Sequence, residues 1–121
     1  MERRDLLKMT GAGIGALSVS SLLATVAKAE ADIQLDSTWD KTFPKSDKVD
    51  HAKIAFKNRY GISLAADLYQ PKDASGKLAA IIISGPFGAV KEQSSGLYAQ
   101  TMAERGFVTL AFDPSYTGES G

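Results

Sequence analysis

Two short loops hold the residues of this chain that are best placed to do chemistry. The first reads Gly85-Pro86-Phe87-Gly88 and follows an uninterrupted apolar run over residues 78–84. The second occupies residues 113–118, reads Asp-Pro-Ser-Tyr-Thr-Gly, and begins where a second apolar run, residues 107–113, ends. Ligands of open α/β sheets bind at the carboxyl ends of the strands. The sequence therefore predicts that any functional site lies where these two loops meet.

The other reactive side chains form no recognisable catalytic pattern. Absence of cysteine excludes disulfides, thiolate nucleophiles and zinc–thiolate sites. The single histidine, His51, is expected on the surface of the first strand, far from the strand ends. Asp67 and Asp113 have no partner carboxylate at helical spacing, so neither a glycosidase pair nor a metal cluster is predicted. Asp113 before Pro114 is instead typical of a turn-initiating carboxylate.

Charge and motif content predict neither a nucleic-acid partner nor a cofactor. The chain has 14 basic and 14 acidic residues, so no electrostatic argument for nucleic-acid binding exists. A glycine-rich loop after a strand can also cradle phosphate, but residues 85–88 lack the Gly-x-Gly-x-x-Gly spacing and the P-loop lysine. We therefore expect no cofactor and no metal.

The elements that must position the two loops form a strand, loop, helix and strand over residues 78–113. Consecutive apolar positions in residues 78–84 are typical of a central parallel strand that is covered on both faces. Ser94 or Ser95 can cap the helix and Gly106 can end it. Residues 91–93, Lys-Glu-Gln, are expected to form a solvated entry to that helix. One apolar stripe should combine Leu97, Tyr98, Thr101 and Met102.

Two alternating segments, residues 48–57 and 62–69, precede this unit. The Asn-Arg-Tyr-Gly sequence between them, residues 58–61, is typical of a turn, so the pair is predicted to form an antiparallel hairpin. Residues 30–47 are polar and irregular and are interpreted as a linker or an arm over the domain surface, with Trp39 in a surface groove. At 121 residues the chain holds at most one domain.

Residues 1–29 have the order of a twin-arginine signal peptide. Arg3-Arg4-Asp5-Leu6-Leu7-Lys8 is followed by a mildly hydrophobic stretch, residues 9–27, and by the small-x-small site Ala27-Lys28-Ala29. We expect cleavage after Ala29 and a periplasmic or extracellular location, with the twin-arginine export machinery as partner. The alternative is an uncleaved membrane anchor, but glycines and hydroxyls make residues 9–27 a poor transmembrane helix. Contact with the membrane is therefore expected only during export.

Three segments in this order resemble the amino-terminal part of an α/β-hydrolase of the dienelactone-hydrolase or exported-peptidase-like group. They are the hairpin over residues 56–71, the strand and loop over residues 81–93, and the strand and loop over residues 110–121. The resemblance covers nearly all of residues 48–121. It implies an antiparallel hairpin leading into a β-α-β unit of a mainly parallel sheet. It also implies hydrolysis of ester or amide bonds in a small-molecule or peptide substrate.

The resemblance assigns a role to the glycine-rich loop. In that fold the loop after the third strand supplies a backbone N–H to the oxyanion hole, which stabilises the charged oxygen of the tetrahedral intermediate. Pro86 has no N–H, so the resemblance implies Phe87 as the donor, with Gly88 next. The simpler interpretation is that Gly85 and Gly88 only let a tight loop turn away from the sheet.

The resemblance also shows what residues 48–121 lack. Gly118-Glu119-Ser120-Gly121 looks like the start of a Gly-x-Ser-x-Gly elbow, but an elbow joins strand to helix directly and residues 114–117 intervene here. His51 is misplaced, because the triad histidine normally comes last in chain order. We therefore expect a truncated α/β-hydrolase domain, inactive by itself, with strand order 1-2-4-3 and residues 78–84 at an open edge. The alternative is a small exported binding module that uses this edge for strand addition.

Overall fold

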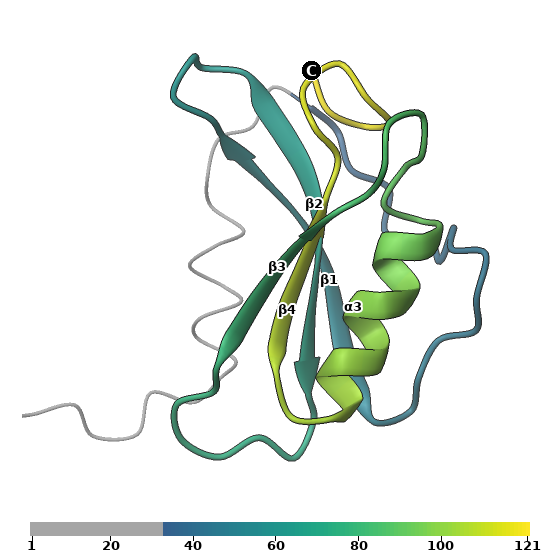
Figure 1. The fold of residues 1–121 in the computed structure, drawn as a ribbon, viewed down its shortest axis with the longest axis vertical. Coiled ribbons are helices and arrows are strands. Elements are labelled where there is room, and N and C mark those ends of the chain that lie inside the picture. Colours follow the sequence, from purple (N-terminus) through teal and green to yellow (C-terminus); the bar gives the residue numbers. More distant parts are fainter. Residues whose placement is uncertain (1–32) are drawn as a thin grey trace, which may run out of the picture.

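The computed structural model describes residues 33–121, which form a mixed four-stranded sheet with one helix against it (Figure 1). The elements are β1 (Val49–Lys57), β2 (Ser63–Pro71), β3 (Ala80–Ser84), α3 (Ser94–Glu104) and β4 (Val108–Phe112). The predicted signal peptide, residues 1–29, lies outside the described residues. Within residues 33–121, no helix has the length and apolar character needed to span a membrane.

The first two strands form the predicted hairpin. β1 and β2 pair antiparallel from Val49 opposite Pro71 to Lys57 opposite Ser63. Gly61 adopts a φ of +79°, a conformation that glycine reaches without steric cost. The prediction is confirmed, with β1 starting one residue later than expected and β2 extending to Pro71.

The sheet has the order β1-β2-β4-β3, as predicted. β4 pairs antiparallel with β2 and parallel with β3, so β3, α3 and β4 form the expected β-α-β unit. Among the strands of residues 33–121, β3 pairs with β4 alone, so its other edge is open as predicted. The expectation that β3 is covered on both faces is wrong. Ile82 is 70% exposed whereas Ile81 and Ile83 are half-buried, because α3 covers one face of this edge strand only.

The start of α3 differs from the prediction, whereas its end agrees with it. Gln93 occupies the amino-terminal cap position and makes no side-chain capping bond, so the prediction of Ser94 or Ser95 as the cap is wrong. The hydroxyl of Ser95 is buried without a hydrogen-bond partner. The predicted end is confirmed: Gly106 has a φ of +101° and donates its N–H to Ala103, 3.0 Å away.

α3 packs on the sheet through its small residues, not through the predicted apolar stripe. Its buried side is formed by Ser95, Gly96, Ala99, Gln100 and Ala103. Leu97 and Tyr98 are 47% and 54% exposed, so the predicted stripe is wrong. A Cβ atom on Gly96 would lie 2.3 Å from the carbonyl oxygen of Lys91 and about 3.1 Å from the Phe43 ring. Small side chains therefore allow a helix position that larger ones would prevent.

The arm that precedes β1 lies over the same face as α3. Residues Val49, Tyr69, Ala99, Ala103 and Ala111 form the hydrophobic core, and Trp39 and Ile83 pack against it. The Trp39 indole donates a hydrogen bond to the Phe43 carbonyl at 2.8 Å. Gln100 of α3 accepts from the Ser46 N–H and donates to the Pro44 carbonyl. The two bonds to Gln100 hold residues 44–46 against α3.

Candidate functional site

The two loops singled out by sequence lie side by side at the carboxyl ends of β3 and β4 (the upper end of Figure 1). In the first loop Gly88 has a φ of +81°, and the Ala89 N–H bonds the Pro86 carbonyl at 3.1 Å. The Phe87 side chain is fully exposed. Within residues 33–121, neither the Phe87 nor the Gly88 N–H donates to another backbone group. Both residues are exposed.

One buried carboxylate, that of Asp113, joins the two loops. Lys91, at the end of the first loop, donates its backbone N–H to Asp113 Oδ1 at 2.8 Å and its ammonium to Asp113 Oδ2 at 2.8 Å. The Glu119 N–H, directly after the second loop, bonds Asp113 Oδ2 at 3.3 Å. Lys91 is 1% exposed and Asp113 is fully buried. The predictions of a solvated Lys91 and of a merely turn-initiating Asp113 are wrong, because the two side chains neutralise each other inside the protein.

The Lys91 ammonium has two further carboxylate partners. It lies 2.6 Å from Glu119 Oε2 and also contacts Glu92 Oε1. Burial alone disfavours the charged ammonium, but the hydrogen bonds to Asp113, Glu119 and Glu92 outweigh burial and raise the Lys91 pKa above its ordinary value. Burial likewise opposes the charge of Glu119, yet its bonds to Lys91 and Lys53 lower its pKa. Lys91 and Glu119 are therefore both held in their charged forms.

The ion pairs continue from the second loop to the arm. Lys53 on β1 lies 2.9 Å from Glu119 and 2.6 Å from Asp40 of the arm. Asp40 also pairs with Lys41 at 2.6 Å, and Lys41 lies 3.1 Å from Asp67 on β2. Burial opposes both charges, but these bonds lower the pKa of Asp40 and raise that of Lys53. Arm, hairpin and strand-end loops thus share one salt-bridge network.

This network brings together three carboxylates that no sequence pattern groups. Oxygen atoms of Asp40, Glu92 and Glu119 lie within 4.8 Å of one another. Each of the three is bonded to a lysine ammonium, from Lys53 or Lys91 among others. Lysine ammonium groups therefore neutralise these three carboxylates, and the cluster is part of the salt-bridge network.

His51 lies on the sheet face that the arm and α3 cover, away from the strand-end loops. Its Nε2 lies 2.7 Å from Asp67 Oδ1, and its ring sits 5.2 Å from that of Trp39 and 5.0 Å from that of Tyr69. Its side chain is 11% exposed, so the expectation of a surface position is wrong. The reason is that the arm carries Trp39 across β1. His51 contacts an acid but no nucleophile among the described residues.

Ser120 makes hydrogen bonds typical of a structural turn. Its hydroxyl donates to the Asp113 carbonyl at 2.8 Å and accepts from the Ala65 N–H at 2.9 Å. The Gly121 N–H bonds the Ser63 carbonyl at 2.9 Å, so this loop is fastened to the start of β2. Both sides of the hydroxyl are occupied by backbone groups.

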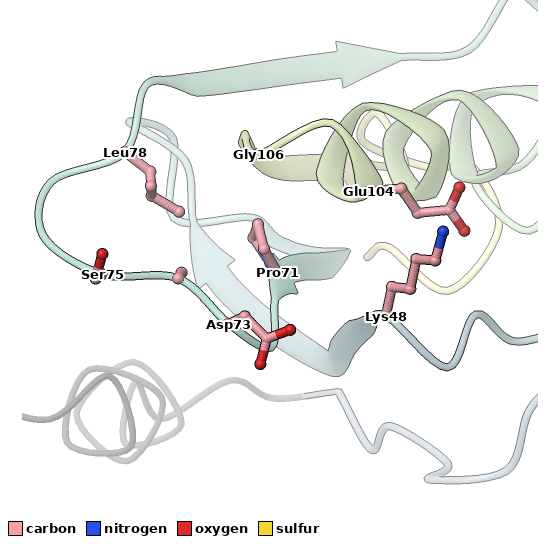
Figure 2. A pocket seen from close by; sticks show the side chains of 8 residues that line it. Lys48, Pro71, Asp73, Ser75, Leu78, Glu104 and Gly106 are labelled. Carbon is pink, nitrogen blue, oxygen red and sulfur yellow. The ribbon is translucent and has the colours of Figure 1, made fainter.

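A groove of about 450 Å³ lies at the opposite end of the sheet (Figure 2). It is lined by Lys48, Pro71, Asp73, Ala74, Ser75, Leu78, Glu104 and Gly106. Figure 2 shows the side chains of Lys48 and Glu104 pointing toward each other across it. Its three charged residues are all exposed. The groove thus lacks the buried polar groups that the strand-end loops contain.

Lys91 is the site residue that sequence reasoning missed, although one signal for it exists. Residues 78–90 contain no charged side chain, and Lys91 is the first charge after them. A charged side chain that directly follows an apolar strand and its loop must find an opposite charge if the loop folds back on the sheet. The partner, Asp113, lies 22 positions further along the chain.

Comparisons with known proteins find close relatives. No protein-family model matches the chain. The chain is 77% identical over 90 residues to the uncharacterized protein PA2218 of Pseudomonas aeruginosa, a match that covers 74% of this chain and 24% of that protein. It is 49% identical over 73 residues to the uncharacterized protein YcjY of Escherichia coli, covering 57% of this chain and 24% of that protein. The chain therefore spans about a quarter of the length of these relatives.

A solved structure supports the fold. The crystal structure of the hypothetical protein PA2218 matches with a TM-score of 0.71 at 77% identity, over 74% of this chain and 28% of the crystallised chain. The described residues are accordingly a small α/β domain with a mixed four-stranded sheet and one helix.

Proposed function

We propose that this chain is the amino-terminal part of an exported α/β-hydrolase-type enzyme that cleaves ester or amide bonds. The observation that carries the proposal is the loop after β3. At the carboxyl end of a parallel strand it presents two backbone N–H groups, of Phe87 and Gly88, that bond no other backbone group within residues 33–121. Such donors stabilise the oxyanion of an acyl-transfer intermediate when their positions are preset.

Under this proposal the described residues contribute the oxyanion donors, and the catalytic triad lies elsewhere in the enzyme. The Ser120 hydroxyl is bound to backbone groups and His51 to Asp67, so neither is placed as a member of a triad. The relatives are about four times as long as the matched segment, which leaves room for a nucleophile, an acid and a histidine. A fifth strand would pair with the open edge of β3. By itself, this chain is expected not to hydrolyse esters.

The proposal includes a cellular location. Arg3 and Arg4, the apolar stretch and the Ala27-Lys28-Ala29 site support export by the twin-arginine machinery and a periplasmic or extracellular enzyme. The substrate would be a small molecule or a peptide.

A second candidate is a small exported binding module, and the open edge of β3 favours it. Ile82 is 70% exposed, and no charge protects residues 78–90 against pairing with another strand. Such a module would add a strand of its partner to this edge. Size-exclusion chromatography separates the two candidates, since a module should be monodisperse and an incomplete hydrolase domain should aggregate.

A chimera tests the hydrolase proposal with this chain's own loop. Residues 33–121 would replace the corresponding segment of full-length PA2218, and hydrolysis of p-nitrophenyl acetate and of amide analogues would be measured. Phe87→Pro removes the N–H and should lower kcat by about a hundredfold to a thousandfold. Phe87→Ala keeps the N–H and is the matched control, with a much smaller effect.

Two results would contradict the proposal. A Phe87→Pro chimera that is folded by circular dichroism and keeps near-normal turnover would show that the loop is only a turn. An unsubstituted chimera that hydrolyses no ester or amide and does not react with a fluorophosphonate would remove the hydrolase assignment as a whole.

A further inference from the structure

We propose that Lys91 is a positioning residue for the candidate oxyanion loop: by binding Asp113 at two points it sets where the Phe87 and Gly88 N–H groups lie. The inference rests on the proposed function and adds a residue to it. Lys91 does not act on the reacting atoms, because its ammonium is occupied by Glu92, Asp113 and Glu119.

The two ends of the loop are fastened to consecutive residues of the neighbouring chain segment. At its start, Ser84 of β3 pairs with Phe112 of β4. At its end, Lys91 binds Asp113, the residue after Phe112. The loop between them, residues 85–90, therefore leaves the sheet and returns to it at adjacent positions. Its path is closed by the Lys91–Asp113 contact, and the next residue, Glu92, accepts a backbone bond from the Thr42 N–H at 3.2 Å.

The contact fixes direction as well as distance. The backbone N–H and the ammonium of Lys91 bind different oxygens of one carboxylate, each at 2.8 Å. Two charge-assisted bonds between the same two residues restrict rotation in a way that a single bond does not. The backbone orientation at Lys91 is thereby set, and so is the direction from which the loop approaches.

Neither partner is free to shift. A Cβ atom on Gly118 would lie 2.3 Å from Asp113 Oδ2, so the second loop presses directly on the carboxylate. A Cβ atom on Gly96 would lie 2.3 Å from the Lys91 carbonyl oxygen, so the first turn of α3 presses on Lys91. The Lys91–Asp113 contact is therefore held on both sides by backbone. Oxyanion donors act only within a narrow range of positions, and a 1 Å displacement costs about a hundredfold in rate.

The test uses two proteins and the variant Lys91→Met, which has a similar length and no charge. In the chimera with PA2218, kcat for p-nitrophenyl acetate should fall about tenfold to a hundredfold while KM changes less than about threefold, because donor placement affects the transition state more than the ground state. Inhibition by phenylboronic acid, which mimics the tetrahedral intermediate, should weaken in parallel with kcat. Lys45→Met, on an exposed lysine of the arm, is the matched control and should change neither constant.

Hydrogen exchange in this chain itself supplies a readout that does not need activity. Lys91→Met should speed exchange of the Ala89 and Lys91 amides at least about tenfold and leave the β1–β2 hairpin amides unchanged. If Lys91→Met fails to fold, Asp113→Asn, which keeps an acceptor for the Lys91 N–H, should show a smaller effect of the same kind.

The outcomes separate the two proposals. Folded Lys91→Met with kcat within about twofold of the parent and unchanged exchange would overturn the positioning role. An inactive parent chimera would remove the proposed function, and the exchange rates would still decide whether Lys91 fixes the loop.

Discussion

The buried pair between Lys41 of the arm and Asp67 of β2 allows a sharp stability prediction. Both side chains are fully buried and the ammonium lies 3.1 Å from Asp67 Oδ1. Lys41→Met removes the ammonium and leaves a buried carboxylate whose remaining neighbour is His51, while its Oδ2 atom has no partner. Asp40, the other partner of Lys41, keeps Lys53 at 2.6 Å, so the loss is concentrated on Asp67.

The expected loss is large relative to the stability of a small domain. Breaking a buried pair by removing one partner costs about 3–5 kcal/mol, whereas the free energy of unfolding of such domains is about 5–15 kcal/mol. With a urea m-value of about 1–3 kcal/mol/M, the midpoint should fall by at least about 1 M. Trp39 fluorescence follows the arm, because Trp39 is the single tryptophan and lies in it. Circular dichroism follows the sheet and helix.

A double-mutant cycle isolates the pair. Asp67→Asn keeps an acceptor for His51 and removes the charge, so the double variant contains no unpaired buried ion and should recover about 1–3 kcal/mol relative to the sum of the single changes. Lys45→Met, on an exposed lysine of the same arm, should stay within about 0.5 kcal/mol of the parent. A loss below about 1 kcal/mol for Lys41→Met, with coupling below about 0.5 kcal/mol, would refute the reasoning.

Two further predictions concern pH and export. The lowered pKa values of Asp40 and Glu119 contribute stability above their ordinary values of 3.8 and 4.5, and that contribution is lost as pH falls. The raised pKa values of Lys53 and Lys91 contribute stability below 10.5, and that contribution is lost as pH rises through the folded values. The urea midpoint followed by circular dichroism should therefore fall as pH drops below about 4 and as it rises above about 10.5, and a midpoint unchanged at pH 2.5 would contradict this. Changing both Arg3 and Arg4 to Lys should leave the precursor in the cytoplasm by cell fractionation, and unchanged export would remove the twin-arginine assignment.

Local patterns were sufficient for the hairpin and the β-α-β unit, whereas the strand order came from the resemblance to the α/β-hydrolase fold. The Asn-Arg-Tyr-Gly turn, residues 58–61, lies between two alternating segments, and both signals act over a few residues. The same holds for Gly106, whose positive φ ends α3. The β-α-β unit followed from two apolar runs with a helix between them.

Contacts across the chain could not be predicted in this way. Lys91 was expected in solvent because its neighbours in sequence are polar, whereas its burial depends on Asp113 and Glu119. The predicted helix stripe rests on the helical spacing of mostly apolar residues, but close approach of α3 to the sheet selects small residues such as Gly96 and Ala99. Both errors arise because tertiary packing decides what a local pattern leaves open.

The strand order has a consequence for the order of events during synthesis. β4 is the last of the four strands to be made, yet it lies between β2 and β3 in the sheet. The hairpin can close once Pro71 has emerged from the ribosome, but β3 has no strand to pair with until residues 108–112 follow. During that interval the uncharged residues 78–90 remain unpaired in the nascent chain. Insertion of β4 between the hairpin and β3 therefore joins the four described strands into one sheet, and a nascent chain stalled between Ser84 and Val108 would be the form most in need of a chaperone.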